Sequence, residues 1–239
     1  GDGFGSSPKS GKENAYVMRS NSFYTRRLHS LLGVIPLCLF FVSHALTNFQ
    51  AAEGGPERFR QAVNFINNLP ILPVLEFVLI WAPLVFHGVY GLYVAYQSNI
   101  NTGRFGYGRN WAFALQRISG VITLIFVAWH VYETRIQLFF GNITHHDFGR
   151  VMHDIATNGL AFTLYTIGVL ASAFHFANGL WAFCVSWGIT VGPRAQRISS
   201  YFWMGVFVIV AGMFLAALIS FRSEAFAETA SVLTQTAIG

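Results

Sequence analysis

Histidine is the residue type in this chain whose placement points most directly to chemistry. Eight histidines occur among few charged residues, and His44, His87, His130 and His175 each lie deep within a different long apolar run. An imidazole is a good metal ligand and proton carrier, but inside apolar surroundings it is costly without a partner or a task. One such histidine is often only a hydrogen bond between helices. Four of them, on four successive runs, favour a shared function.

The surroundings of these histidines are those of a membrane protein. Hydrophobic residues make up 54% of the sequence and charged residues only 10%, whereas a soluble domain carries about 25% charged residues. The apolar content excludes a disordered chain. A disulfide-built module is excluded because Cys38 and Cys184 are the two cysteines of the sequence, and each lies inside an apolar run.

Five stretches are long enough to cross the hydrocarbon core, which takes about 20 residues of helix. They lie near residues 28–50, 71–97, 111–138, 157–189 and 199–221. These runs are continuously apolar, whereas a transmembrane barrel would show alternating segments of about 10 residues. We therefore predict an all-α integral membrane protein with five transmembrane helices in residues 23–222. A polar tail, flexible or ordered by a partner, is expected at 1–22, and an outer tail at 223–239.

The basic residues predict the orientation of the chain. Most of the 15 Lys and Arg residues fall on the N-terminal side of the predicted spans. They are Lys9, Lys12, Arg19, Arg26, Arg27, Arg104, Arg109, Arg117, Arg194 and Arg197. Because cytoplasmic connections carry the excess of Lys and Arg, we expect the N-terminus in the cytoplasm and the C-terminus outside.

Depth within the spans divides the four histidines into two levels. Counting from the nearest outer charged residues puts His44 and His130 towards the outer face, and His87 and His175 deeper. Two imidazoles are too few for structural zinc, which takes four ligands. They suit haem, which supplies four nitrogens itself and takes one or two axial ligands. Because the sequence has no Cys-x-x-Cys-His motif, we predict two non-covalent b haems stacked within a bundle of the first four helices.

The remaining histidines have simpler interpretations. Three lie in the connection between the third and fourth spans and are expected to be solvated loop residues: His145, His146 and His153. His29 lies near the inner interface, next to Ser30, with no partner histidine expected at its level. It suits the headgroup region, a haem propionate or a quinone carbonyl.

Four stretches together cover most of residues 23–200. They are FYTRRLHSLLGVIPL (23–37), LEFVLIWAPLVFHGVYGLYVA (75–95), RNWAFALQRISGVITLIFVAWHVYETR (109–135) and FHFANGLWAFCVSWGITVGPRAQRIS (174–199). In these stretches the chain resembles the cytochrome b membrane-anchor subunit of succinate:quinone oxidoreductase, in the succinate dehydrogenase and fumarate reductase family. The resemblance is to the single-chain, five-helix, two-haem type of Gram-positive bacteria.

The resemblance implies a site and partners. His44 and His130 match the ligands of the outer, distal haem b, and His87 and His175 those of the inner, proximal haem b. A flavoprotein subunit with FAD and an iron–sulfur subunit would dock at the cytoplasmic face of a bacterial cytoplasmic (inner) membrane. Electrons from succinate would pass through the proximal and then the distal haem to a quinone, expected to be menaquinone. No nucleic acid is involved, and the oligomeric state of the complex stays open.

Alternatives remain at this stage. A quinol:fumarate reductase anchor belongs to the same family, although members specialised for fumarate reduction can carry a Glu where this chain has Ala173. A histidine-relay transporter or a passive anchor would use the same histidines without haem. The candidates for the quinone site are Glu76, Glu133 and Arg135 on the outer side, and Arg27, His29, Ser30 and Arg117 on the inner side.

Overall fold

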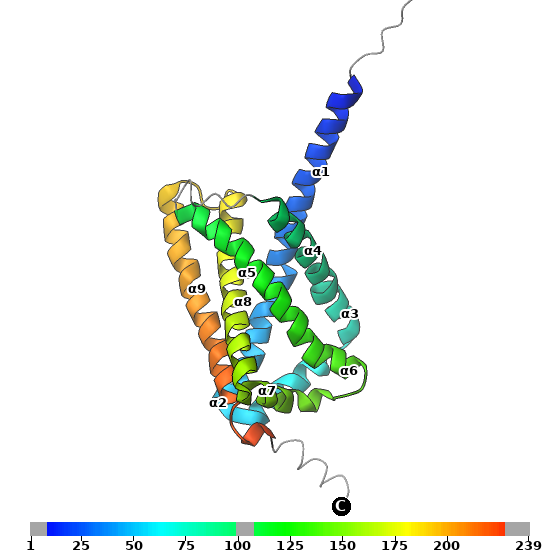
Figure 1. Cartoon of the computed structure of the whole chain (residues 1–239), viewed down its shortest axis with the longest axis vertical. Coiled ribbons are helices and arrows are strands. Elements are labelled where there is room, and N and C mark those ends of the chain that lie inside the picture. Colours follow the sequence, from blue (N-terminus) through cyan, green and yellow to red (C-terminus); the bar gives the residue numbers. More distant parts are fainter. Residues whose placement is uncertain (1–8, 99–107, 228–239) are drawn as a thin grey trace, which may run out of the picture.

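The computed structural model describes residues 9–98 and 108–227 (Figure 1). Every regular element in these ranges is a helix, and five helical stretches are long and apolar enough to cross a membrane. They are Ser22–Asn67, Leu72–Gln97, Asn110–Phe139, Gly159–Ser186 and Pro193–Ser220. The prediction of an all-helical chain with five long apolar helices is therefore confirmed.

The first span is longer at both ends than the predicted 28–50. Helix α1 (Lys9–Val34) begins inside the stretch predicted as a tail, of which residues 1–8 lie outside the described ranges. Helix α2 (Pro36–Asn67) follows almost directly. It is broken at Gly54 and Gly55, and Gly55 has a φ of 65° that a glycine adopts without strain. The residues after this break run across the end of the bundle that the basic residues predict to face outwards, which we call the outer end (Figure 1).

The second and third spans each contain a π-helical turn near their outer ends. In the second span, α3 (Leu72–Glu76), the π-turn η1 (Phe77–Trp81) and α4 (Ala82–Gln97) form one continuous rod. In the third, α5 (Gly108–Val131) leads into the π-turn η2 (Tyr132–Ile136) and α6 (Gln137–Phe139). Isolated π-turns are uncommon and occur frequently at functional sites.

The fourth span begins later than the predicted 157–189. The short helix η3 (His145–Asp147) and helix α7 (Phe148–Thr157) precede it and lie across the outer end of the bundle (Figure 1). Asn158 then caps α8 (Gly159–Ser186), because its side chain accepts a hydrogen bond from the N–H of Ala161. The long uncharged run is therefore divided by this cap into two helices, and α8 ends at Ser186 without projecting to 189.

The fifth span, α9 (Pro193–Ser220), packs against α8 and α2, while α8 also packs against α5. Small side chains let these helices approach: Ala45, Ala173 and Ala211 are all buried at the contact. Large apolar side chains point outwards elsewhere, such as Leu39 (70% exposed) and Ile125 (68% exposed). An apolar outer surface of this kind suits a lipid environment.

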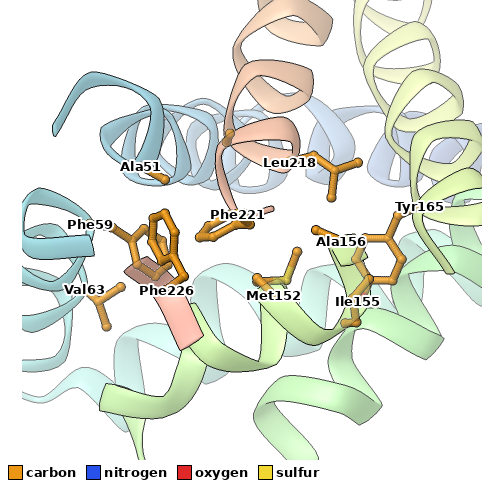
Figure 2. Close-up of a cluster of buried hydrophobic side chains, with 11 residues drawn as sticks. Ala51, Phe59, Val63, Met152, Ile155, Ala156, Tyr165, Leu218, Phe221 and Phe226 are labelled. Carbon is orange, nitrogen blue, oxygen red and sulfur yellow. The ribbon is translucent and has the colours of Figure 1, made fainter. Parts of the chain in front are cut away.

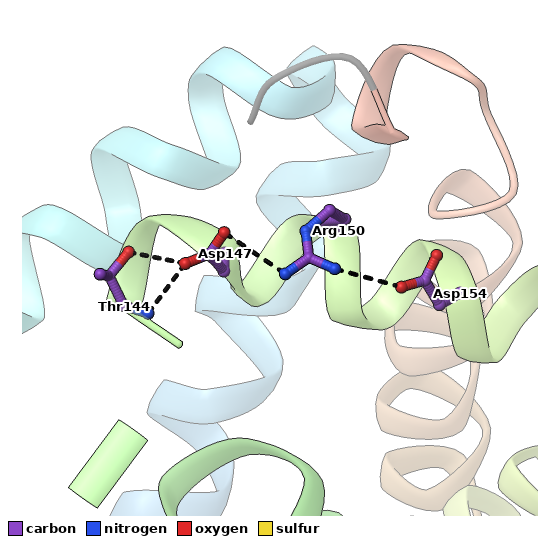
Figure 3. A network of polar contacts seen from close by, with 4 residues as sticks. All are labelled: Thr144, Asp147, Arg150 and Asp154. Carbon is purple, nitrogen blue, oxygen red and sulfur yellow. Dashed lines mark hydrogen bonds and ion pairs between the residues drawn. The ribbon is translucent and has the colours of Figure 1, made fainter. Parts of the chain in front are cut away.

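A second apolar cluster closes the outer end of the bundle (Figure 2). Phe59 from α2, Met152 from α7 and Tyr165 from α8 meet there with Phe221 and Phe226, which follow α9. The start of η3, which leads into α7, is fixed by a polar network (Figure 3) in which the Asp147 carboxylate accepts hydrogen bonds from the N–H and hydroxyl of Thr144, both at 2.8 Å. The fold therefore has an ordered cap at this end.

Candidate functional site

The helices bring the four deep histidines together in two pairs. The ring centres of His87 on α4 and His175 on α8 lie 6.2 Å apart. Those of His44 on α2 and His130 on α5 lie 5.8 Å apart. We call these the inner pair and the outer pair, after the faces predicted from the basic residues. Along α5, Gln116, which contacts His175, precedes His130 by roughly 20 Å of helix at 1.5 Å per residue.

The inner pair is oriented by backbone carbonyl groups. His87 Nδ1 lies 3.1 Å from the carbonyl oxygen of His29, and His175 Nδ1 lies 3.0 Å from that of Gln116. Because a carbonyl oxygen can only accept, each Nδ1 carries the hydrogen and each neutral ring keeps its lone pair on Nε2. Metal-ligating histidines in proteins almost always donate their other N–H in this way.

Two glycines allow neighbouring helices to approach the inner rings. A Cβ atom on Gly33 would lie 2.6 Å from Cε1 of His87, and one on Gly120 would lie 2.8 Å from Cε1 of His175. Both distances are too short for real atoms, so a larger residue at either position would push the ring out of place. Because glycine has no side chain, Gly33 and Gly120 leave space for the two imidazoles.

The outer pair has looser polar contacts. Asn48 Nδ2 lies 3.4 Å from His44 Nε2, and the hydroxyl of Tyr165 lies 3.5 Å from His130 Nδ1. Within residues 9–98 and 108–227, neither outer imidazole donates to a backbone carbonyl. Aromatic rings surround them instead, with Phe214 beside His44 and Phe126 beside His130.

Both pairs fit a haem with two axial imidazoles. A metal about 2 Å from a nitrogen of each ring sets the two ring centres roughly 6 Å apart, close to the observed 6.2 and 5.8 Å. In the described ranges, no three His, Cys, Asp or Glu side chains gather where they could hold a metal ion. Two imidazoles per level are what haem needs, since the porphyrin brings four nitrogens of its own.

The candidates for the quinone site separate into two groups at opposite ends. At the outer end, Glu76 on α3 forms an ion pair with Arg135 on η2. Both side chains are mostly buried, and each lies at or beside a π-turn. Nearby, Glu133 accepts a hydrogen bond from the indole of Trp129 at 3.3 Å. A carboxylate and a guanidinium thus join the second and third spans close to the outer pair.

Three of the four inner candidates, Arg27, His29 and Ser30, already have partners within the chain. The Ser30 hydroxyl accepts from the indole of Trp187 at 3.3 Å, and Arg27 lies over the same indole ring at 4.8 Å. The ring of His29 stacks on that of His87, with centres 4.2 Å apart and planes within 5°. The prediction that His29 has no partner histidine is therefore wrong. His29 lies well inside a helix that begins at Lys9, and a count from the predicted start of the span could not place it.

Comparison with known proteins agrees with this architecture. A family model described as "Succinate dehydrogenase/Fumarate reductase transmembrane subunit" matches residues 98–215. The "Succinate dehydrogenase cytochrome b558 subunit" of Bacillus subtilis (strain 168) is 46% identical over 202 residues, which cover 84% of this chain and 98% of that protein. The chain belongs to the succinate dehydrogenase cytochrome b558 subunit family. The resemblance inferred from the four sequence stretches is thereby confirmed.

The three histidines predicted to be solvated loop residues differ from one another. His145 and His146 lie on η3 with ring centres 4.0 Å apart. Burial, followed by the positive potential of His146 and Arg135, lowers the pKa of His145. His153 contradicts the prediction, because it is only 7% exposed and its Nδ1 lies 2.8 Å from the carbonyl oxygen of Phe221. It belongs to an amphipathic helix, and the helical spacing of Met152, Ile155 and Ala156 was the signal for it.

Several residues that contact the inner pair were not identified from the sequence alone. Gln116 contacts His175, and Asn178 donates to the Gln116 side chain at 2.8 Å and to the carbonyl of Ala112 at 2.9 Å. Gly33 and Gly120 make room for the rings. A glycine four residues after His29, His87, Gln116 and His175 was a visible regularity in the sequence.

Proposed function

We propose that the chain is the di-haem b membrane subunit of a succinate dehydrogenase and hands electrons from an iron–sulfur subunit to a membrane quinone. The observation that carries the proposal is the pair of imidazoles, from two different spans, at each of two levels in one bundle. The relative is named a cytochrome b558 subunit, and its 46% identity over most of both chains supports a b-type haem here.

In this proposal His87 and His175 hold the inner haem, and His44 and His130 hold the outer haem. Held by two imidazoles, each haem would supply a one-electron carrier and would not bind oxygen. The chain's own contribution is to orient the four imidazole rings and to keep them in a water-poor interior. At the inner level, the backbone carbonyls of His29 and Gln116 orient the rings. At the outer level, aromatic side chains such as Phe126 and Phe214 surround the rings and exclude water.

We place the quinone site at the outer end, at the Glu76–Arg135 pair, and expect menaquinone to be its substrate. Quinone reduction needs two protons as well as two electrons, so a protonatable side chain must reach the bound quinone. Glu76 can hold and release a proton at its carboxylate, and Arg135 keeps that carboxylate oriented. The inner candidates, His29 and Ser30, are less suitable because their polar atoms are engaged with His87 and Trp187.

Three further features complete the proposal. The bias of basic residues supports a cytoplasmic N-terminus in a bacterial inner membrane. Docking of the iron–sulfur and flavoprotein subunits would then occur at the end near the inner pair. The family model covers fumarate reductases too. Ala173 is fully buried, two residues before His175, and offers no carboxyl group at that point, which favours the succinate-oxidising direction.

A reduced-minus-oxidised visible spectrum of the purified complex, combined with haem and protein quantification, tests this function. The expected result is two b haems per chain, both reduced when succinate is added to the complete complex. A colourless preparation would instead support a passive anchor or a transporter. A His146→Ala variant is a matched control, since it removes an exposed imidazole outside both pairs and should retain both haems.

A further inference from the structure

Each inner histidine is joined to a neighbouring span by two reciprocal hydrogen bonds. His87 Nδ1 donates to the carbonyl of His29 at 3.1 Å, and His29 Nε2 donates to the carbonyl of His87 at 3.1 Å. His175 Nδ1 donates to the carbonyl of Gln116 at 3.0 Å, and Gln116 Nε2 donates to the carbonyl of His175 at 3.0 Å. We call these two arrangements the His29–His87 clasp and the Gln116–His175 clasp.

The glycines repeat along with the hydrogen bonds. A glycine stands four residues after every member of the two clasps, at Gly33, Gly91, Gly120 and Gly179. A Cβ at each of these positions would approach the partner side chain to 2.6, 3.3, 2.8 and 2.9 Å, in that order. Both clasps therefore need close contact between their helices, α1 with α4 and α5 with α8. The same local design occurs twice in the bundle.

In the two clasps, His29 and Gln116 occupy equivalent positions. Glutamine has no basic ring nitrogen to offer a metal, so the role common to both positions is to donate an N–H to the carbonyl of an inner histidine. Each is also held in place by a further contact. Asn178 Nδ2 donates to Gln116 Oε1 at 2.8 Å, which turns the amide nitrogen towards His175. His29 is held by its parallel stack on the ring of His87.

We propose that His29 and Gln116 are equivalent positioning residues, which fix the tautomer and ring orientation of the inner ligands His87 and His175. This inference rests on the proposed function, because it assigns the inner pair to a haem. It also gives His29 a role other than ligand or quinone contact. The outer pair has no counterpart of the clasps among the described residues, so the effect should be confined to the inner haem.

The test compares His29→Gln with His29→Leu in the complete complex. Haem content per chain, the midpoint potential of each haem, and the electron paramagnetic resonance spectrum, which reports ring orientation, are the readouts. His29→Gln should resemble the wild type because it restores the donor. His29→Leu should lose the inner haem or shift its potential and resonance, while the outer haem stays unchanged as an internal reference.

Two results would overturn the inference. In one, His29→Leu retains a wild-type inner haem; in the other, His29→Gln and His29→Leu disturb it equally. Gln116→Leu tests the second clasp by the same readouts, so failure of one variant to assemble still leaves an independent arm. A wild-type complex without haem would refute the proposed function. If the wild type contains two haems and His29→Leu changes none of the readouts, only the positioning role is refuted.

Discussion

The inner and outer histidine pairs have nearly the same ring spacing, but they are held in different ways. The inner rings are fixed by hydrogen bonds to backbone carbonyls and by glycines that bring two helices against them. The outer rings have side-chain contacts at 3.4 and 3.5 Å and are otherwise surrounded by aromatic side chains. Backbone atoms move little without unfolding a helix, so the inner imidazoles are pre-organised, whereas the orientation of the outer imidazoles depends on packing.

The largest expected effect comes from filling the space beside each pair. Gly120→Ala would place a methyl group 2.8 Å from the His175 ring, and Gly168→Ala would place one in steric conflict with the ring of Phe126, which lies beside His130. Overpacking of this kind costs about 1–3 kcal/mol. We expect the first variant to lose the inner haem selectively and the second to perturb the outer one.

Haem quantification and thermal unfolding of both variants check this expectation. Gly205→Ala on α9 is the matched control, because outside the backbone of its own helix turn no atom lies within 4 Å of the added methyl group, and it should retain both haems. If Gly120→Ala and Gly168→Ala affected the same haem, the assignment of the two pairs to two separate haems would be contradicted.

A second prediction concerns the ion pair at the outer end. Glu76→Gln removes the carboxylate that pairs with Arg135, and with it the proposed proton donor to the quinone. Quinone reductase activity should fall on the order of 100-fold, as for loss of a general acid or base. Both haems should remain, and oxidation of succinate with a soluble dye should be unchanged.

Steady-state assays with quinone and with dye separate these outcomes. Glu57→Gln serves as the control, since this exposed outer carboxylate is paired with Arg60 and lies outside the proposed site. Equal quinone reductase activity in Glu76→Gln and the wild type would move the quinone site away from this pair, and the inner end would then become the better candidate.

The smallest effect is expected in the cap over the outer end. Burial alone would raise the pKa of Asp147, but hydrogen bonds from Thr144 and the charge of Arg150 outweigh it, and the pKa is lowered on balance. A carboxyl group with a lowered pKa stabilises the fold above its unfolded value of about 4 and loses this contribution as the pH falls through the folded value. Asp147→Asn should therefore cost about 1 kcal/mol at neutral pH and nothing in strong acid.

Thermal unfolding of wild type and Asp147→Asn at a series of pH values measures this difference. The two melting temperatures should converge as the pH decreases below about 4. The inner haem should keep its potential in this variant, since the cap lies at the other end of the bundle. A gap in melting temperature that persists unchanged into acid would show that the carboxylate charge is not what stabilises the cap.

The sequence predicted those features that depend on local composition. The five apolar helices follow from the length of the uncharged runs, and the family follows from the four stretches that contain the histidines. The sequence did not reveal the break at Asn158, because a single cap residue inside an uncharged run does not alter hydropathy. His153 was misjudged for a related reason, since its burial depends on how α7 packs over the end of α9.

The contacts around the inner pair could not be derived from residue counts. Whether His29 faces His87 depends on the rotation of α1 about its axis and on the close approach that Gly33 allows. Gln116 is a polar residue near the start of a span, and nothing in its own sequence context indicates a contact with His175. Its role becomes visible only when α5 and α8 are packed together and Asn178 orients its amide group.

Haem stoichiometry in the four single-ligand variants tests the central claim most directly. His44→Ala and His130→Ala should each leave one haem per chain, with the same residual spectrum and midpoint potential in both. His87→Ala and His175→Ala should each leave the other haem, with a second shared spectrum. If the four variants do not fall into these two matching sets, or if all retain two haems, the assignment of two stacked imidazole pairs is contradicted.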